Sequence, residues 1–162
     1  VVDALVRAFA PLGRGADGDG HASAASAAGL TDELRAVMWD RVGLRRDAAG
    51  LAEASAAIAS IRDRAGVLTV GGPAAANAAW QEALDLASRL AVCEAVVAAA
   101  VTRTETRGVH VRADHPDPDP GWLRTVIVRG RPGELRVATV PVVLDPLTPD
   151  GVASAAGAGG AR

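Results

Sequence analysis

The feature that most constrains this chain is a long helical pattern running from about Ala75 to Arg103. Apolar residues recur along it at the spacing of one helix face. They are Leu86, Leu90, Cys93, Val97 and Ala100, with Leu84, Ala87 and Ala91 beside them. The many alanines favour helix and let neighbouring helices approach closely. The pattern therefore predicts a long helix that packs against other helices.

Two shorter helices are predicted before it. Thr31 is a suitable N-cap, with Asp32 and Glu33 placed at the positive end of the helix dipole, and Gly43 is a stop. The inner face of this helix is Leu34, Val37, Met38 and Val42. Asp47 caps the next helix, Gly66 ends it, and its inner face is Leu51, Ala54, Ile58, Ile61 and Ala65. Three amphipathic helices with short connections indicate a small bundle.

The character of the sequence changes after Gly108. The stretch from Asp114 to Pro120 holds three prolines and cannot continue a helix. Two runs rich in β-branched residues follow, Leu123–Arg129 and Glu134–Val143, separated by Gly130-Arg131-Pro132-Gly133. This arrangement predicts a β-hairpin. The expected fold class is mainly α, a three-helix bundle with a small C-terminal β-hairpin and a disordered tail.

The predicted domain organisation has four parts. Residues 30–145 form the helical domain with its hairpin, and the Gly/Ala/Ser-rich stretch 11–29 is a linker. Residues 146–162 are predicted to be a disordered tail. The chain opens directly on Val1-Val2-Asp3, so we interpret it as a fragment, with residues 1–10 as the remnant of a helix from a preceding domain.

Composition argues against several classes of function. The net charge of −2 and the 2% aromatic content provide neither a positive field nor a stacking surface for nucleic acid. No apolar run is long enough to span a membrane. Cys93 lies on the inner helix face and is expected to be a buried structural thiol. His110, His115 and the nearby aspartates match no ligand spacing, so no metal site is predicted.

A charged motif follows the long helix. Residues 103–116 read R-T-E-T-R-G-V-H-V-R-A-D-H-P. This segment resembles the pattern R-x-E-S-R-G-x-H-x-R-x-D-(F/Y)-P of the succinate dehydrogenase, fumarate reductase and L-aspartate oxidase superfamily of flavoproteins. The match in register comprises Arg103, Glu105, Arg107, Gly108, His110, Arg112, Asp114 and Pro116. Residues 34–43, the step Arg45-Arg46-Asp47 and Trp122 are similar to further blocks of the same family.

The resemblance implies the C-terminal domain of a larger cytoplasmic enzyme. In such enzymes hydride passes between a dicarboxylate and FAD, which the missing N-terminal domain would bind. No catalytic or cofactor-binding residue is therefore assigned within this chain, and the fragment alone is expected to be inactive and to hold no FAD. The flavin-binding domain of the same polypeptide is the expected partner, joined by an iron–sulfur subunit if the enzyme is of the succinate dehydrogenase type.

The departures from the pattern bear on the substrate. Thr106 replaces the usual serine, His115 replaces an aromatic residue, and Ser88 stands where asparagine is common. Asp119-Pro120-Gly121-Trp122 differs from the D-D-x-N-W of succinate dehydrogenases. The resemblance thus favours L-aspartate oxidase, which converts L-aspartate to iminoaspartate in NAD biosynthesis. The alternatives are the flavoprotein subunit of a succinate dehydrogenase or fumarate reductase, and a helical interaction module without catalysis.

The charged cluster admits two interpretations. Gly108 is expected just past the helix end, with Arg103 and Arg107 on one helix face and Glu105 accepting from an arginine elsewhere. His110 and Arg112 should point to the same side of an extended segment, where Asp114 can pair with one of them. Arginine forks suit carboxylates, so the cluster could dock the domain onto the flavin domain and support the dicarboxylate site from behind. Otherwise it is a self-contained corner that fixes the turn from helix to strand.

Overall fold

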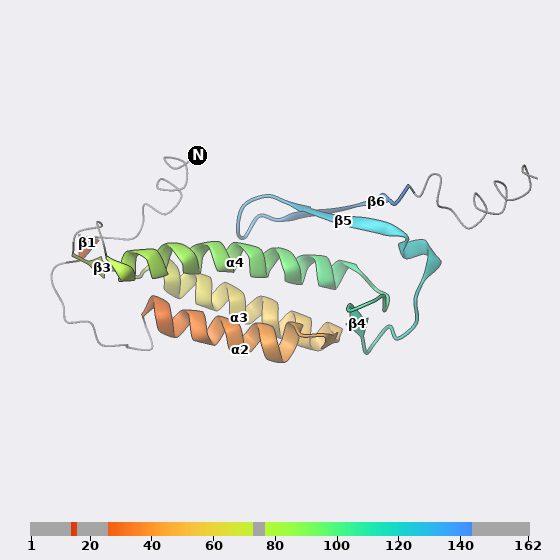
Figure 1. Ribbon diagram of the computed structural model, residues 1–162, viewed down its shortest axis with the longest axis horizontal. Coiled ribbons are helices and arrows are strands. Elements are labelled where there is room, and N and C mark those ends of the chain that lie inside the picture. The colour runs from red at the N-terminus through yellow and green to blue at the C-terminus, as the bar shows by residue number, and fades with distance from the viewer. Residues whose placement is uncertain (1–13, 16–25, 73–76, 144–162) are drawn as a thin grey trace, which may run out of the picture.

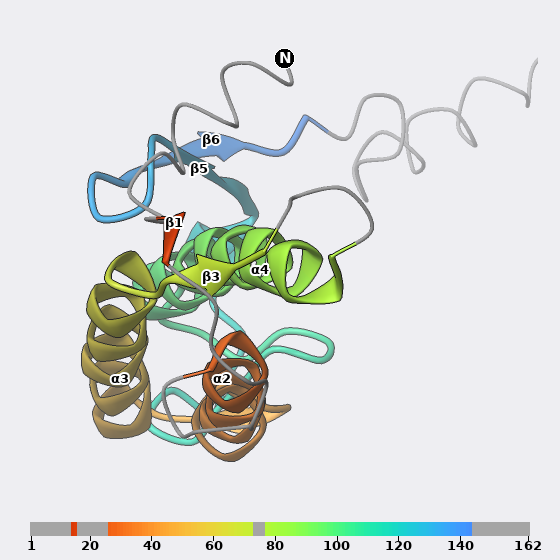
Figure 2. The same cartoon turned by 90° about the vertical axis from the view of Figure 1, so that its left-hand side faces the viewer.

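The computed structural model describes residues 14–15, 26–72 and 77–143. Its three long helices are α2 (Ala27–Val42), α3 (Ala48–Gly66) and α4 (Ala78–Thr102). They lie side by side, and an antiparallel hairpin runs along α4 on the side away from α2 and α3 (Figures 1 and 2). The predicted mainly α class, with a three-helix bundle and a C-terminal hairpin, is confirmed. The predicted remnant at residues 1–10 and tail at residues 146–162 lie outside the described residues.

Each helix begins at a side-chain cap. The Ser26 hydroxyl accepts from the amide of Gly29, the Asp47 carboxylate from that of Gly50, and the Asn77 side chain from that of Ala79. The cap at Asp47 was predicted. The predicted start of the first helix at Thr31 is wrong, because Ser26 offers an equivalent cap and one more turn buries Ala27 and Leu30. The long helix likewise begins later than predicted, at Ala78.

The core lies between the three helices and consists of small and branched aliphatic side chains. Its largest fully buried members are Leu30, Leu51, Ile58, Ile61 and Leu86. Cys93 and Trp80 are half-buried against this core. Trp39, in contrast, is 83% exposed and does not contribute to this core. The helical period places Trp39 on the side of α2 opposite to the buried Leu30 and Leu34.

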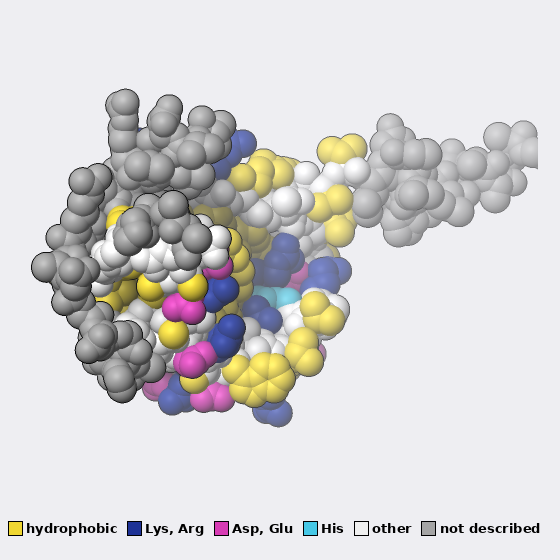
Figure 3. Space-filling view, turned by 60° about the vertical axis from the view of Figure 1, so that its left-hand side comes forward, with side chains coloured by type: hydrophobic (Ala, Val, Ile, Leu, Met, Phe, Trp, Pro, Cys, Tyr) yellow, Lys and Arg dark blue, Asp and Glu magenta, His cyan; other side chains and the backbone are white. Residues whose placement is uncertain are grey.

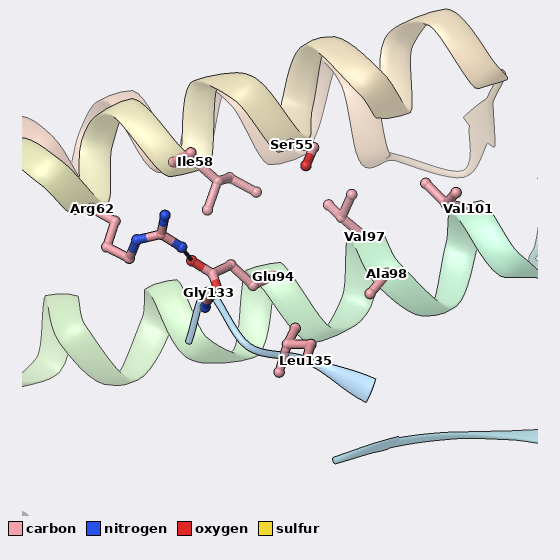
Figure 4. A pocket seen from close by; sticks show the side chains of 10 residues that line it. Ser55, Ile58, Arg62, Glu94, Val97, Ala98, Val101, Gly133 and Leu135 are labelled. Carbon is pink, nitrogen blue, oxygen red and sulfur yellow. Dashed lines mark hydrogen bonds and ion pairs between the residues drawn. The ribbon is translucent and has the colours of Figure 1, made fainter. Parts of the chain in front are cut away.

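The hairpin joins β5 (Arg124–Arg129) to β6 (Arg136–Pro141), with Arg124 opposite Pro141 and Arg129 opposite Arg136. Its loop is tied to the bundle by Glu94 of α4. The Glu94 carboxylate accepts from Arg62 of α3 at 2.5 Å and from the amide of Gly133 at 2.8 Å (Figure 4). These contacts close one side of a groove of about 480 Å³ between α3, α4 and the loop. A helix-to-helix ion pair thereby sets the position of the hairpin.

Short strand pairs close the two ends of the bundle. At one end β1 (Arg14–Gly15) pairs in parallel with β3 (Val70–Gly71). At the other, β2 (Arg45–Arg46), between α2 and α3, pairs in parallel with β4 (Val111–Arg112). The pairing of β2 with β4 brings the α2–α3 connection against the charged motif. A 3₁₀ turn at Pro120–Trp122 then leads into β5.

Candidate functional site

The charged motif folds into a compact corner where α4 ends. We call Arg103, Glu105, Arg107, His110, Arg112 and Asp114 the ion-pair corner. The helix stops at Thr102, so Arg103 and Arg107 do not share a helix face as predicted. Gly108 has the expected positive φ, 57°, but it lies in the tight turn that pairs Arg107 with His110 and not at the helix end. Arg103 already has extended backbone dihedrals, so residues 103–106 separate the end of α4 from the turn at Gly108.

Glu105 lies at the centre of the corner and its side chain is fully buried. Its carboxylate accepts two hydrogen bonds from Arg107, at 2.8 and 2.9 Å, and one from Arg103 at 2.5 Å. The backbone amide of Asp119 donates a fourth at 2.9 Å. Four donors on one buried carboxylate satisfy it fully, which is the condition for a buried charge to be tolerated.

These donors stabilise the charged form of Glu105. The hydrogen bonds from Arg107 are the main cause that lowers its pKa from 4.5 to about 2, with smaller contributions from the Asp119 amide and Arg103. Burial acts in the opposite direction and is outweighed. Glu105 therefore stays ionised throughout the physiological range and acts as a fixed negative charge, with no proton to give or take in catalysis.

Arg112 and Asp114 connect the ends of two helices. The Arg112 guanidinium, 3% exposed, donates to the carbonyls of Ala100 and Arg103 at the C-terminus of α4. It also forms a bidentate pair with Asp114, with both distances 2.8 Å. Asp114 in turn accepts from the amide of Ala48 at the N-terminus of α3. A cation thus meets the negative end of one helix dipole and an anion the positive end of the other, an arrangement that stabilises both ends.

Arg103 ties the corner to the hairpin. Its guanidinium donates to the carbonyls of Trp122 and Arg124, and it lies 5.3 Å from the centre of the Trp122 ring. The Trp122 indole N–H donates to the Thr104 hydroxyl at 3.0 Å. Through these contacts Trp122 anchors the start of the hairpin to the end of α4.

His110 and Arg112 point to the same side of the chain, as predicted. The His110 Nε2 atom lies 3.2 Å from the carbonyl oxygen of Arg103, which also accepts from Arg112. Burial is the main cause that lowers the pKa of His110 below 6.5, and the positive charges of Arg46, Arg112 and Arg103 act in the same direction. The hydrogen bond to the Arg103 carbonyl opposes them and is outweighed. The imidazole is therefore neutral at pH 7.

We expect the His110 imidazole to titrate with a midpoint below 6.5 in an NMR titration of its ring protons. Because its folded-state pKa is lowered, the unfolded chain takes up the proton first, and stability falls as the pH drops below about 6.5. The His110→Gln variant should lack this part of the acid sensitivity. A midpoint at or above 6.5 would contradict the role given to burial and to the surrounding arginines.

Arg46 is the residue that the sequence analysis missed. It lies on β2 opposite Arg112, near His110, and burial followed by the charge of Arg112 lowers its pKa. Its Nε–H is buried and has no hydrogen-bond partner among the described residues. Within that part of the chain its guanidinium also has no acidic partner. The step Arg45-Arg46-Asp47 was noted only as family-like, and the parallel pairing of β2 with β4 was not predicted.

The corner offers no place for a metal or a flavin. In the described ranges no group of three or more His, Cys, Asp or Glu side chains is placed to hold a metal ion. Helix N-termini with unpaired amides are a common binding site for phosphate groups. At α3 that position is occupied by the carboxylates of Asp47 and Asp114. The N-terminus of α3 therefore does not suit the pyrophosphate of FAD.

Across residues 26–72 and 77–143, no helix combines the length and the apolar composition needed to cross a bilayer.

Comparisons with known proteins agree on one group of flavoproteins. The family model described as the C-terminal part of the fumarate reductase flavoprotein matches residues 31–153. A polypeptide of the CoM/CoB fumarate reductase of Methanothermobacter marburgensis is 34% identical over 99 residues, which cover 61% of this chain and 18% of that protein. L-aspartate oxidase of Rhodospirillum rubrum is 40% identical over 113 residues, which cover 64% of this chain and 35% of that protein.

The same group appears among solved structures. The Sdh1 complex of Mycobacterium smegmatis in the apo form contains a chain that matches with a TM-score of 0.72 and 30% identity. The match covers 94% of this chain and 27% of that one. The chain thus spans a minor part of the length of each of these relatives.

Proposed function

Because the chain belongs to the family of fumarate reductase flavoprotein C-terminal domains, we propose that it is the helical domain of a longer FAD-dependent oxidoreductase that acts on a dicarboxylate. The observation that carries the proposal is the ion-pair corner, where the family-like motif folds as one network around Glu105. The N-terminus of α3 is capped by two carboxylates, and we propose that the cofactor is held by the flavin-binding part of the same polypeptide. That part is the first proposed partner.

L-aspartate is the proposed substrate. The 40% identity with an L-aspartate oxidase and the departure of Asp119-Pro120-Gly121-Trp122 from D-D-x-N-W both favour it. The reaction would be the two-electron oxidation of L-aspartate to iminoaspartate, with FAD taking up the hydride. The enzyme would then act in the cytoplasm, in NAD biosynthesis.

A second candidate is the flavoprotein subunit of a succinate dehydrogenase or fumarate reductase. The likeness to the Sdh1 complex, with a TM-score of 0.72 and 30% identity, favours this alternative. Its further partner would be an iron–sulfur subunit.

Turnover by the full-length protein separates the candidates. We expect the purified holoenzyme to oxidise L-aspartate, and to oxidise succinate much more slowly, with an artificial electron acceptor. D-aspartate is the control for recognition of the configuration at Cα, and succinate is the control for recognition of the amino group. Faster oxidation of succinate than of L-aspartate would reject the first candidate in favour of the second.

We also propose that the ion-pair corner supports docking onto the flavin domain by holding the helix ends and the hairpin in one arrangement. Most of its charges are paired within the corner: Arg103 and Arg107 with Glu105, and Arg112 with Asp114. This internal pairing supports the interpretation of the cluster as a self-contained corner. The corner would then affect the active site only indirectly, by fixing the shape of the domain.

In the full-length enzyme, we expect Arg107→Ala to lower the melting temperature while leaving the KM for the dicarboxylate nearly unchanged. Arg107 is 44% exposed, so Glu105 would keep the donors from Arg103 and the Asp119 amide, and water could replace part of the loss. Thermal denaturation measures the change in melting temperature, and steady-state kinetics measure the KM. An unchanged melting temperature with a sharply raised KM would instead mean that Arg107 contacts the substrate.

A further inference from the structure

One arginine beside the corner forms no ion pair. Glu105 pairs with both Arg103 and Arg107, and Asp114 pairs with Arg112, whereas Arg46 beside them has no carboxylate partner within the described ranges. Its Nε–H is buried without an acceptor, which is costly when nothing pairs with it. The side chain as a whole is only partly buried, and its terminal guanidinium nitrogens are not among the buried atoms, so a group from outside can reach them. A negatively charged group would complement this unpaired cation.

Large apolar side chains are exposed on the segments that flank Arg46 and His110 in the chain. Leu44 is 69% exposed and its carbonyl accepts from the amide of Val111, while Val109, 77% exposed, precedes His110 in the same turn. Trp39 lines a shallow depression on α2 together with Gly43, the residue before Leu44. We call Trp39, Leu44, Arg46, Val109 and His110 the docking patch. Figure 3 shows hydrophobic, basic and histidine side chains gathered on one face of the molecule.

The composition of this patch is that of a protein interface. Exposed tryptophan and arginine are the residue types that most often carry binding energy, and apolar neighbours exclude water from the charge pair at the centre. A small anion would satisfy Arg46 but would leave Trp39, Leu44 and Val109 in water. A protein surface that presents a carboxylate covers all of them at once.

We propose that the docking patch binds an acidic side chain on the flavin-binding part of the same polypeptide, with the carboxylate pairing with Arg46. This inference rests on the proposed function, because it takes the remainder of a flavoenzyme as the partner. The chain spans 18% of the length of one relative and 35% of another, so in those proteins most of the chain lies outside the matched region.

Photo-crosslinking in the full-length protein tests the patch. The substitution Val109→benzoylphenylalanine places the crosslinker on an exposed position beside His110. We expect the crosslinked peptides, mapped by mass spectrometry, to come from the flavin-binding part and to contain Asp or Glu. Adding Arg46→Glu should lower their yield about tenfold, as expected for loss of a buried interfacial charge pair. Arg45→Glu, at the exposed neighbouring position, is the matched control and should leave the yield unchanged.

The charge reversal Arg46→Glu should leave the domain folded, because it places a carboxylate beside the positive Arg112 and beside His110. Arg46→Gln, which removes the charge at similar size, provides a second variant and should lower the yield in the same direction. Crosslinks to a second copy of the chain, or a yield insensitive to both Arg46 variants, would overturn the proposal. So would a rise in melting temperature with inorganic phosphate or succinate that Arg46→Glu abolishes, since this would make a small anion the occupant.

The crosslinking experiment and the proposed enzymatic activity can fail independently of each other. Crosslinks that map as expected in a protein with no activity on dicarboxylates would leave the docking patch standing and reject the function. Turnover of a dicarboxylate without such crosslinks would reject the patch alone.

Discussion

Replacing Arg112 by alanine is expected to destabilise the 162-residue chain by about 3–5 kcal/mol, the usual cost of removing one partner from a buried ion pair. Arg112 is 3% exposed and donates to Asp114 and to the carbonyls of Ala100 and Arg103. Without it, the two carbonyls lose a donor and the Asp114 carboxylate keeps only the Ala48 amide and its own local contacts. Urea denaturation at pH 7 measures the loss.

Two further variants make this result specific. Arg112→Lys keeps the charge but cannot reproduce the planar fork, so an intermediate loss is expected. Arg136→Ala removes an exposed arginine from β6 and should change the free energy of unfolding by less than about 0.5 kcal/mol. If Arg112→Ala were no more damaging than Arg136→Ala, the bridge between the ends of α4 and α3 would not contribute to stability.

The second large effect is expected for Glu105→Gln, with a loss of about 3 kcal/mol at pH 7. Glutamine fits the space but carries no charge, and its NH₂ group must face one of the donors that now point at the carboxylate. Arg103 and Arg107 then lose their anion. Denaturant unfolding of the variant and of wild type over a range of pH measures both the loss and its pH dependence.

The pH dependence has a defined sign. The pKa of Glu105 is lowered from 4.5 to about 2 on folding, so its contribution is complete above about pH 5 and is lost as the pH falls through 2. The difference between wild type and Glu105→Gln should therefore shrink on acidification. Glu82→Gln, at an exposed position on α4, is the control and should show no such difference. A difference that stays constant down to pH 2 would mean that the charge of Glu105 is not what stabilises the corner.

Much of the fold followed from local patterns. Asp47 caps α3 and the inner faces of the helices pack into the core as the helical period requires. The hairpin followed from two β-branched runs around Gly130 and Gly133, both of which have positive φ. Such features depend on neighbouring residues alone, so the sequence contains enough information to predict them.

The details that were wrong or missed depend on contacts between distant segments. The start of α2 at Ala27 is decided by how much apolar surface the extra turn buries, and the exposure of Trp39 by which face of that helix meets α3 and α4. Arg46 becomes significant only because β2 pairs with β4, which lies far along the chain. A parallel pair of two residues has no sequence signature, and so the position of the unpaired Arg46 beside the corner could not be predicted.

The most direct test of the central claim is anaerobic mixing of the full-length protein with L-aspartate, followed by the absorbance of its flavin. The claim that this chain is the helical domain of a dicarboxylate-oxidising flavoenzyme predicts that the protein purifies with FAD and that L-aspartate bleaches it. Bleaching by succinate in place of L-aspartate would keep the enzyme class and change the substrate. A full-length protein that binds no flavin, or whose flavin no four-carbon dicarboxylate reduces or reoxidises, would contradict the claim.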